Sequence, residues 1–98
     1  MKVTSFGEVL WDDFPDGKRL GGAPLNLVSR LRSFGADAAI ISRVGDDEDG
    51  KELVRQVAAK QVATDWIQTD TEQATSLVKV ILSASGSASY EIVYPCAW

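Results

Sequence analysis

Two glycines followed by a proline and an asparagine form the segment of this sequence best suited to bind a polar ligand. The segment is Gly21-Gly22-Ala23-Pro24-Leu25-Asn26, and Pro24 favours the first turn of a helix. Glycines before a helix let the backbone approach a ligand, while the free N–H groups of the first turn point outward. Asn26 adds donors and an acceptor, a mixture that suits vicinal hydroxyls better than an anion. The alternative is a glycine-rich turn in which Asn26 only caps the helix.

Asp12 is the second candidate for binding a ligand. It follows the apolar-rich segment from Val3 to Leu10, which we interpret as a first strand that ends near Trp11 and Asp12. Ligands of open α/β sheets bind at the carboxyl ends of strands, and a carboxylate there accepts hydrogen bonds from two hydroxyls at once. Taken alone, Asp12 fits an ordinary surface aspartate better than a binding residue.

An acidic run resembles two familiar loops but matches neither. In Gly45-Asp46-Asp47-Glu48-Asp49-Gly50-Lys51, the glycine and lysine spacing is that of a phosphate-binding loop, but Glu52 stands where a magnesium-binding Ser or Thr belongs. Four consecutive carboxylates would also repel phosphate. When Gly50 is aligned with the invariant glycine of a calcium-binding loop, Gly45 stands at the first ligand position and Gln56 stands where a bidentate Glu is needed. Neither residue suits its position, so the run is not a calcium loop. We interpret the run as a solvated loop that caps a helix, and we expect Asp47 to be replaceable.

Composition narrows the remaining functions. The 98 residues contain 45% hydrophobic and 24% charged residues, which predicts one folded domain at most. The net charge is -4 with no basic run, so a nucleic acid partner is not expected. The absence of histidine and the single Cys96 remove the usual zinc spacings and any imidazole base. No signal peptide or membrane-spanning stretch is evident, so we expect a cytoplasmic protein with no membrane partner.

The elements that must position these residues alternate between strand and helix. After the first strand, the turn Phe14-Pro15-Asp16-Gly17 predicts a small hairpin over residues 13–20. A helix with Leu25, Val28, Leu31 and Phe34 on its apolar face then runs from Pro24 to Gly35. Ala38 to Val44 is a strand, and Asp46 or Asp47 caps a second helix whose apolar face carries Leu53, Val54, Val57 and Ala58.

The last third of the chain is expected to be mostly β. Asp65 to Ile67 predicts a short third strand, and Ser76 to Leu82 and Ser89 to Tyr94 predict a hairpin closed by a serine-rich turn. Tyr90, Ile92 and Tyr94 would share one face of its second strand. The fold class is therefore α/β: a partial parallel sheet with flanking helices, plus a separate antiparallel β piece.

Together these motifs resemble the N-terminal signature of the ribokinase and phosphofructokinase-B family of carbohydrate kinases. The resemblance rests on Gly7-Glu8, Trp11-Asp12, Gly21-Gly22-Ala23-Pro24-Leu25-Asn26, Phe34-Gly35 and Ser42-Arg43-Val44-Gly45-Asp46-Asp47-Glu48-Asp49-Gly50. The run Gly7-Glu8-Val9-Leu10-Trp11-Asp12, with Tyr90-Glu91-Ile92 and Ala97-Trp98, is most similar to the fructokinase branch.

The resemblance implies a ribokinase-like fold in which a small β lid, about residues 11–21 and 75–95, closes over a sugar. Its sugar-binding positions correspond to Asp12, Gly21, Gly22 and Asn26. Residues 1–98 would then be the N-terminal part of a sugar kinase domain, with the nucleotide-binding and catalytic part absent. The family's catalytic Gly-Ala-Gly-Asp element does not occur in the sequence, and Gly35-Ala36-Asp37 is only a partial match without a catalytic role.

The implied function is sugar binding within an ATP-dependent kinase whose substrate is fructose or a similar sugar. ATP and Mg are implied for the complete enzyme, and none is expected to bind this chain alone. The resemblance is also consistent with a homodimer formed through the β lid. The alternative is a noncatalytic module that binds sugar or associates through its lid.

Overall fold

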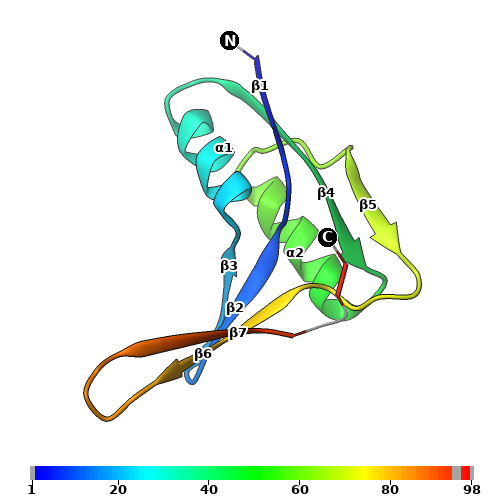
Figure 1. The fold of residues 1–98 in the computed structure, drawn as a ribbon. Helices are drawn as coiled ribbons and strands as arrows, with labels where there is room; N and C mark the ends of the chain where they lie inside the picture. The colour runs from blue at the N-terminus through cyan, green and yellow to red at the C-terminus, as the bar shows by residue number, and fades with distance from the viewer. Residues whose placement is uncertain (1, 94–95, 98) are drawn as a thin grey trace.

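The computed structural model describes residues 2–93, 96 and 97, and it arranges them as two β-sheets and two helices (Figure 1). In chain order the elements are β1 (Lys2–Phe6), β2 (Leu10–Phe14), β3 (Gly17–Gly21), α1 (Ala23–Ser33), β4 (Asp37–Gly45), α2 (Glu48–Ala59), β5 (Ile67–Asp70), β6 (Leu77–Leu82) and β7 (Ala88–Ile92). Neither helix is long and apolar enough to cross a membrane in this described part of the chain.

The first sheet is parallel, with the strand order β1-β4-β5. Alternate side chains of β4 turn toward α1 and α2, so Ala38, Ile40 and Val44 are buried. They pack with apolar side chains of both helices into the main core, whose helical members are Leu25, Val28, Leu53 and Val57. The predicted parallel sheet with flanking helices is therefore confirmed.

The opposite face of this sheet has no helix against it among the described residues. In the parallel register, Phe6 lies beside Ile41, and Arg43 lies beside Gln68. Phe6 is 80% exposed. One face of the sheet thus holds the core, while the other presents apolar and polar side chains to the surface.

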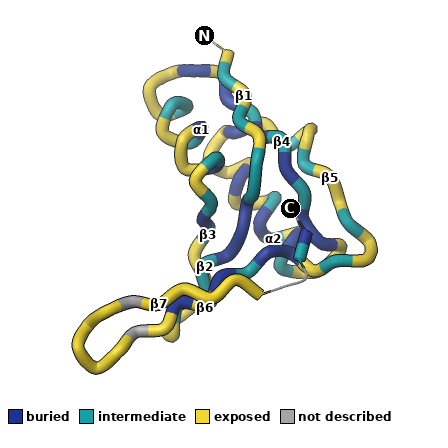
Figure 2. Tube along the Cα trace, viewed as in Figure 1, coloured by how far each residue is buried: buried dark blue, intermediate teal, exposed yellow. Residues whose placement is uncertain are grey.

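The second sheet has four strands in the order β3-β2-β6-β7, and it extends away from the helices (Figure 1). Two antiparallel hairpins, β2–β3 and β6–β7, are joined by parallel pairing of β2 with β6. The sheet is therefore mixed. The sequence predicted a purely antiparallel piece, and this prediction is wrong for the central pair of strands, β2 and β6, which are parallel. The far end of the β6–β7 hairpin is exposed, whereas the base of the sheet is buried against the core (Figure 2).

The first expected strand, Val3 to Leu10, is two strands in the structure. The chain turns at Gly7, where φ is 151°, a conformation that favours glycine. Val9 is then fully buried in the main core, and β2 begins at Leu10. Asp12 consequently lies in the middle of β2 in the second sheet, and not at the carboxyl end of the first strand as predicted.

Three smaller predictions are also corrected. Phe34 and Ala58 are exposed and do not belong to the apolar faces assigned to them, since both lie at the last turn of a helix where the chain leaves the core. The third strand of the parallel sheet is Ile67–Asp70, shifted toward the carboxyl end from the expected Asp65 to Ile67. Tyr94 and Trp98, which the sequence analysis used, lie outside the described residues.

Candidate functional site

Asp12 lies on β2 with its side chain on the face of the sheet opposite to Trp11. The Trp11 indole Nε1 donates a hydrogen bond to the Asp49 carbonyl oxygen at the start of α2, so the Trp11 face packs on α2. Asp12 is therefore directed away from α2. Its strand neighbours are Arg19 on β3 and Val78 on β6.

The Asp12 carboxylate is half-buried and has no protein partner among the described residues. Burial raises the pKa of this carboxyl above its ordinary value, because desolvation disfavours the charged form. Arg19 does not neutralise it: its guanidinium lies 4.1 Å from the centre of the Phe14 ring and 3.4 Å from an Asp16 oxygen. The carboxylate oxygens therefore remain available to hydroxyl donors.

The double glycine passes close to both Asp12 and the segment that follows β1. A methyl group placed on Gly21 would overlap the Asp12 carboxylate. One placed on Gly22, where φ is 110°, would lie 2.7 Å from the Glu8 carbonyl oxygen. Both positions thus require glycine for close approach, as the sequence motif indicated.

Gly22 is the N-cap of α1, and no side chain caps this helix. The Asn26 amide N–H bonds to the Gly22 carbonyl oxygen at 3.0 Å, which is the first helical hydrogen bond. The Asn26 side chain is exposed, so the capping role considered for it is not observed. It borders a surface hollow along the outer side of α1, whose other lining residues are Leu27, Ser29, Arg30 and Ser33. The structure thus brings Asp12, Gly21 and Gly22 to one junction and places Asn26 one turn into the helix.

A second hollow of about 400 Å³ lies where the carboxyl end of β1 meets the middle of β4. Its polar lining comes from Glu8, Ser42, Arg43 and Gln68. The Ser42 hydroxyl is buried without a hydrogen-bond partner among the described residues. Arg43 is already occupied, because it bonds to Asp70 at 3.0 Å and to Gln68 at 2.7 Å. Sequence reasoning did not single out this hollow, since its walls come from three separate strands.

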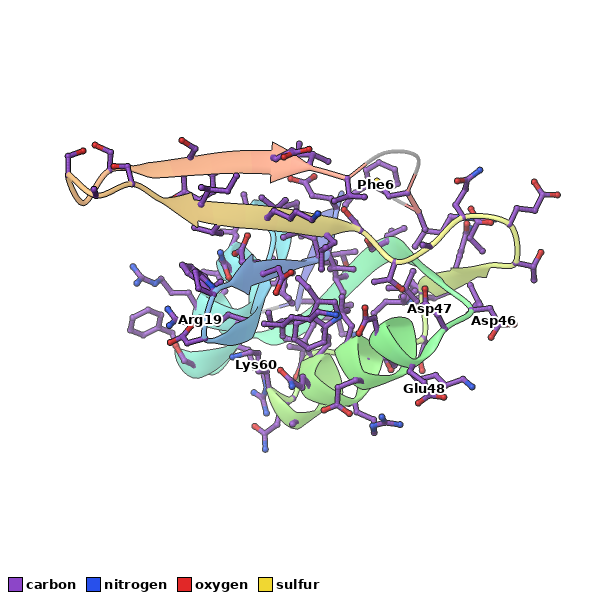
Figure 3. The ribbon with its side chains drawn as sticks, turned by 90° about the horizontal axis from the view of Figure 1, so that it is seen from below. Phe6, Arg19, Asp46, Asp47, Glu48 and Lys60 are labelled. Carbon is purple, nitrogen blue, oxygen red and sulfur yellow. The ribbon has the colours of Figure 1, made fainter. Side chains whose placement is uncertain are left out.

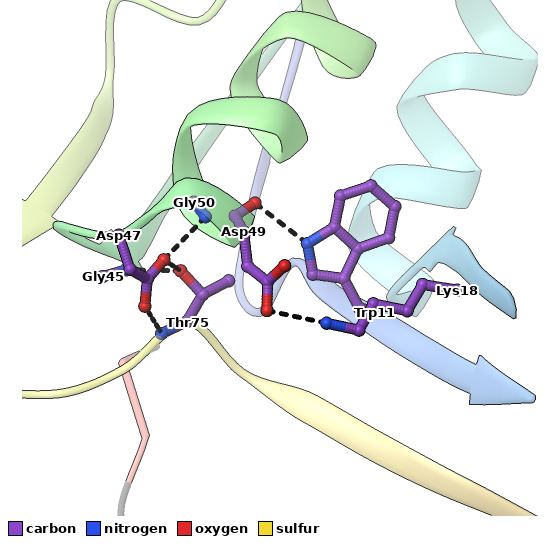
Figure 4. Close-up of polar contacts among 7 residues, drawn as sticks. All are labelled: Trp11, Lys18, Gly45, Asp47, Asp49, Gly50 and Thr75. Atoms are coloured by element: carbon purple, nitrogen blue, oxygen red, sulfur yellow. Dashed lines mark hydrogen bonds and ion pairs between the residues drawn. The ribbon is translucent and has the colours of Figure 1, made fainter.

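Asp47 is the residue whose role the sequence analysis missed. Asp46, Asp47 and Glu48 gather at the N-terminal end of α2 (Figure 3). Asp47 caps the helix as predicted, since its Oδ1 accepts a hydrogen bond from the Gly50 N–H at 2.7 Å. It also accepts two bonds from Thr75, from the hydroxyl at 2.6 Å and from the backbone N–H at 3.0 Å (Figure 4). The interpretation of Asp47 as part of a solvated loop is therefore wrong.

Two glycines of the acidic run make room for Thr75. The Thr75 hydroxyl accepts a hydrogen bond from the Gly45 N–H at 3.0 Å. A methyl group on Gly45 would lie 2.5 Å from the Thr75 nitrogen, and one on Gly50 would lie 2.7 Å from the Thr75 hydroxyl oxygen. Residues 45–50 thus surround a threonine side chain. The fixed spacing Gly-x-Asp-x-x-Gly was the available signal, but the residue it binds lies 28 positions beyond Asp47.

The electrostatics of Asp47 are opposite to those of Asp12. Burial alone would raise the pKa of Asp47, but the hydrogen bonds from Thr75 and Gly50 and the charge of Lys18 outweigh it and hold this pKa below its ordinary value. Lys18 on β3 also forms an ion pair with Asp49 at 2.9 Å (Figure 4). The first turn of α2 therefore contacts β2, β3 and the segment before β6.

Comparison with known proteins matches residues 6–94 to the pfkB family of carbohydrate kinases. The fructokinase of Klebsiella pneumoniae is 35% identical over 94 residues, which cover 91% of this chain and 31% of that protein. A protein named probable fructokinase-5 of Arabidopsis thaliana is 32% identical over 100 residues, which cover 90% of this chain and 31% of that protein. The chain thus spans about a third of the length of these relatives.

Solved structures of sugar kinases share the fold. The apo fructokinase of Vibrio cholerae O395 superposes with a TM-score of 0.90 at 30% identity, over 98% of this chain and 35% of that one. A sugar kinase of Pyrococcus horikoshii in complex with ATP gives a TM-score of 0.87 at 29% identity, over 99% of this chain and 35% of that chain. The predicted ribokinase-like α/β fold is confirmed by these neighbours.

Proposed function

Because this chain belongs to the pfkB family of carbohydrate kinases, we propose that its residues form the sugar-binding part of an ATP-dependent sugar kinase. The observation that carries the proposal is the Asp12 carboxylate, which is half-buried, has a raised pKa and has no protein partner among the described residues. Even partial burial of a carboxylate without a partner has a cost, and a ligand that donates hydrogen bonds to it would offset that cost. Two vicinal hydroxyls of a sugar would satisfy both carboxylate oxygens.

The double glycine supports the same ligand. Gly21 leaves room for the Asp12 carboxylate, and Gly22 begins α1 without a side-chain cap, which leaves amide donors of the first turn for a bound group. Sugar hydroxyls both donate and accept, and they match this mixture of carboxylate and amides. Asn26 would contribute from one turn further along α1. The fructokinase names of several relatives favour fructose as the sugar.

ATP and magnesium are assigned to no residue of this chain. The acidic run is the segment whose spacing comes nearest to a phosphate loop, but the Gly50 amide bonds to Asp47 and the Gly45 amide bonds to Thr75. These donors are therefore occupied by protein groups, and the surrounding carboxylates would repel phosphate. We accordingly propose sugar recognition for these residues and derive no step of phosphoryl transfer from them.

A fructose titration of the isotope-labelled chain, followed by NMR, tests the proposal. Fructose should shift the amide signals of Asp12, Gly21 and Gly22. Asp12→Ala should weaken fructose binding by about tenfold to a hundredfold, since hydrogen bonds to a charged group contribute about 1.5 to 3 kcal/mol each. Asn26→Ala should weaken it by about twofold to tenfold, as expected for a neutral amide.

Asp65→Ala is the matched control, because Asp65 is an exposed aspartate far along the chain from this junction. It should leave fructose binding unchanged. A coupled assay with ATP and fructose should stay at background for the 98-residue chain. If fructose shifts no amide of the junction, or if Asp12→Ala binds fructose as the parent does, the sugar-site assignment is wrong.

A second role, association of two chains through the four-stranded sheet, is favoured by exposed apolar side chains on one face of β7. Tyr90 is 68% exposed and Ile92 is 39% exposed, and the two side chains lie on the same face of the strand. Such side chains are typical of interaction surfaces when they gather on one element. Sedimentation of the parent and of Tyr90→Lys tests this role: a dimer that dissociates in the variant supports it, and a parent that is monomeric at every concentration contradicts it.

A further inference from the structure

Asp47 is connected to the strand that carries Asp12 through hydrogen bonds to Thr75 and through the backbone of the next residue. Asp47 binds Thr75, and the next residue, Ser76, accepts a hydrogen bond at its carbonyl oxygen from the Trp11 N–H at 3.1 Å. Trp11 immediately precedes Asp12. The place of Thr75 therefore fixes where β6 begins, and β6 pairs with β2 through Trp11, Asp12 and Asp13.

Thr75 is held more firmly than the ion pair that also joins the start of α2 to the four-stranded sheet. It is 7% exposed, and its hydroxyl and amide both bond to Asp47. The missing side chains of Gly45 and Gly50 bring two further backbone segments against it. By contrast, the Lys18–Asp49 ion pair joins side chains that are 40% and 47% exposed, and such surface pairs are weak.

We propose that Asp47 is a positioning residue for Asp12. By holding Thr75, Asp47 sets the register of β6 against β2 and thereby the place of the Asp12 carboxylate. The inference rests on the proposed sugar-binding role of Asp12. According to this inference, the Gly-x-Asp-x-x-Gly segment of residues 45–50 forms a socket around the Thr75 side chain. The socket does not contact the sugar, and it affects sugar binding only through the position of Asp12.

Three variants separate positioning from helix capping and from general stability. Asp47→Ser keeps a good N-cap, but its single short hydroxyl cannot bond to both Gly50 and the Thr75 backbone. Thr75→Val keeps the shape of the side chain and removes the hydroxyl that bonds to Asp47 and Gly45. Thr75→Ser retains that hydroxyl and is the matched control.

Amide hydrogen exchange of the labelled chain gives a readout that does not depend on sugar. The reporter is the Trp11 amide, and the reference is the Ala63 amide, which bonds to the Ala38 carbonyl oxygen at 2.8 Å in the other sheet. We expect Asp47→Ser and Thr75→Val to accelerate exchange at Trp11 by about tenfold relative to Ala63, and to weaken fructose binding by about tenfold. Thr75→Ser should change both quantities by less than about twofold.

The two readouts separate this inference from the proposed function. If the parent binds no fructose, the proposed function fails, and with it the sugar-related part of the inference, while exchange at Trp11 still decides whether Asp47 positions β2. If the parent binds fructose but Thr75→Val matches it in binding and in Trp11 exchange, Asp47 is not a positioning residue. Equal acceleration at Trp11 and Ala63, or equal damage by Thr75→Ser, would likewise overturn the inference.

Discussion

The regions around Asp12 and Asp47 each contain a half-buried aspartate, but the two carboxylates differ in their hydrogen bonding and in the direction of their pKa shift. Asp47 accepts three hydrogen bonds from Thr75 and Gly50, and its pKa is held below the ordinary value. Asp12 accepts none from the described residues, and burial raises its pKa. Both carboxylates adjoin glycines whose added methyl groups would clash, so the glycines do not distinguish the two regions.

What distinguishes them is whether the protein supplies the hydrogen-bond donors. A carboxylate that the fold satisfies contributes to stability, whereas one that the fold leaves open costs stability and is available to a ligand. We therefore interpret the Asp47 region as structural and the Asp12 region as the binding region. This assignment predicts that substitutions at the two aspartates have opposite consequences for stability and for sugar binding.

Asp47→Ala should destabilise the chain far more than Asp12→Ala. The first change removes an N-cap, worth about 1 kcal/mol, and leaves the N–H and O–H donors of the buried Thr75 without an acceptor, at about 1 to 3 kcal/mol. We expect a loss of about 3 kcal/mol in the free energy of unfolding. Asp12→Ala should change it by less than about 0.5 kcal/mol. Urea unfolding of the three proteins measures both, and equal losses would remove the distinction between the regions.

The contrast between these two aspartates marks what the sequence could and could not predict. The helices and β4 were predictable because their signals are local: apolar spacing, Pro24 at the start of α1 and Asp47 at the start of α2. The position of Asp12 was mispredicted because apolar residues occur on both sides of Gly7, so that the apolar pattern of residues 3–10 did not mark the break there.

Non-local pairing accounts for the other errors. The parallel pairing of β2 with β6 joins Trp11 to Leu77, and no local pattern specifies that partner. The same holds for Asp47 and Thr75, because a threonine in a loop carries no signal that an aspartate 28 residues earlier binds it. The double glycine Gly21-Gly22 was visible in the sequence because its requirement, close backbone approach before a helix, is local.

Stability should depend on pH in opposite directions at the two carboxyls. Asp47 has a lowered pKa when folded, so its contribution is present above the ordinary value of 3.8 and is lost as pH falls through the lower folded value. Asp12 has a raised pKa when folded, so its charged form costs stability above that pKa, and the cost disappears as pH falls.

Asparagine substitutions at the two positions make this difference measurable. At pH 7, Asp47→Asn should be less stable than the parent by about 1 to 2 kcal/mol, and Asp12→Asn should be more stable by a few tenths, about 0.3 kcal/mol. Both differences should shrink toward pH 3. Urea unfolding at pH 7, 5 and 3 checks the signs. If Asp12→Asn is the less stable protein at pH 7, the fold supplies donors to Asp12 and the contrast does not hold.

The smallest expected effect is that of Lys18→Ala, and it tests whether the four-stranded sheet is held by Asp47 or by the ion pair beside it. Lys18 and Asp49 are both about half exposed, so their interaction should contribute only about 0.2 to 0.5 kcal/mol and should weaken further in high salt. The Trp11 indole would still bond to the Asp49 carbonyl, which is a backbone group and does not depend on Lys18.

Arg55→Ala, which removes the exposed Arg55–Glu52 pair within α2, is the matched control for losing a surface ion pair. The two variants should unfold at nearly the same urea concentration. If Lys18→Ala instead approaches the loss seen for Asp47→Ala, then the charge of Lys18 and not the socket around Thr75 holds the sheet, and the distinction between a satisfied and an open carboxylate no longer explains how the two regions differ.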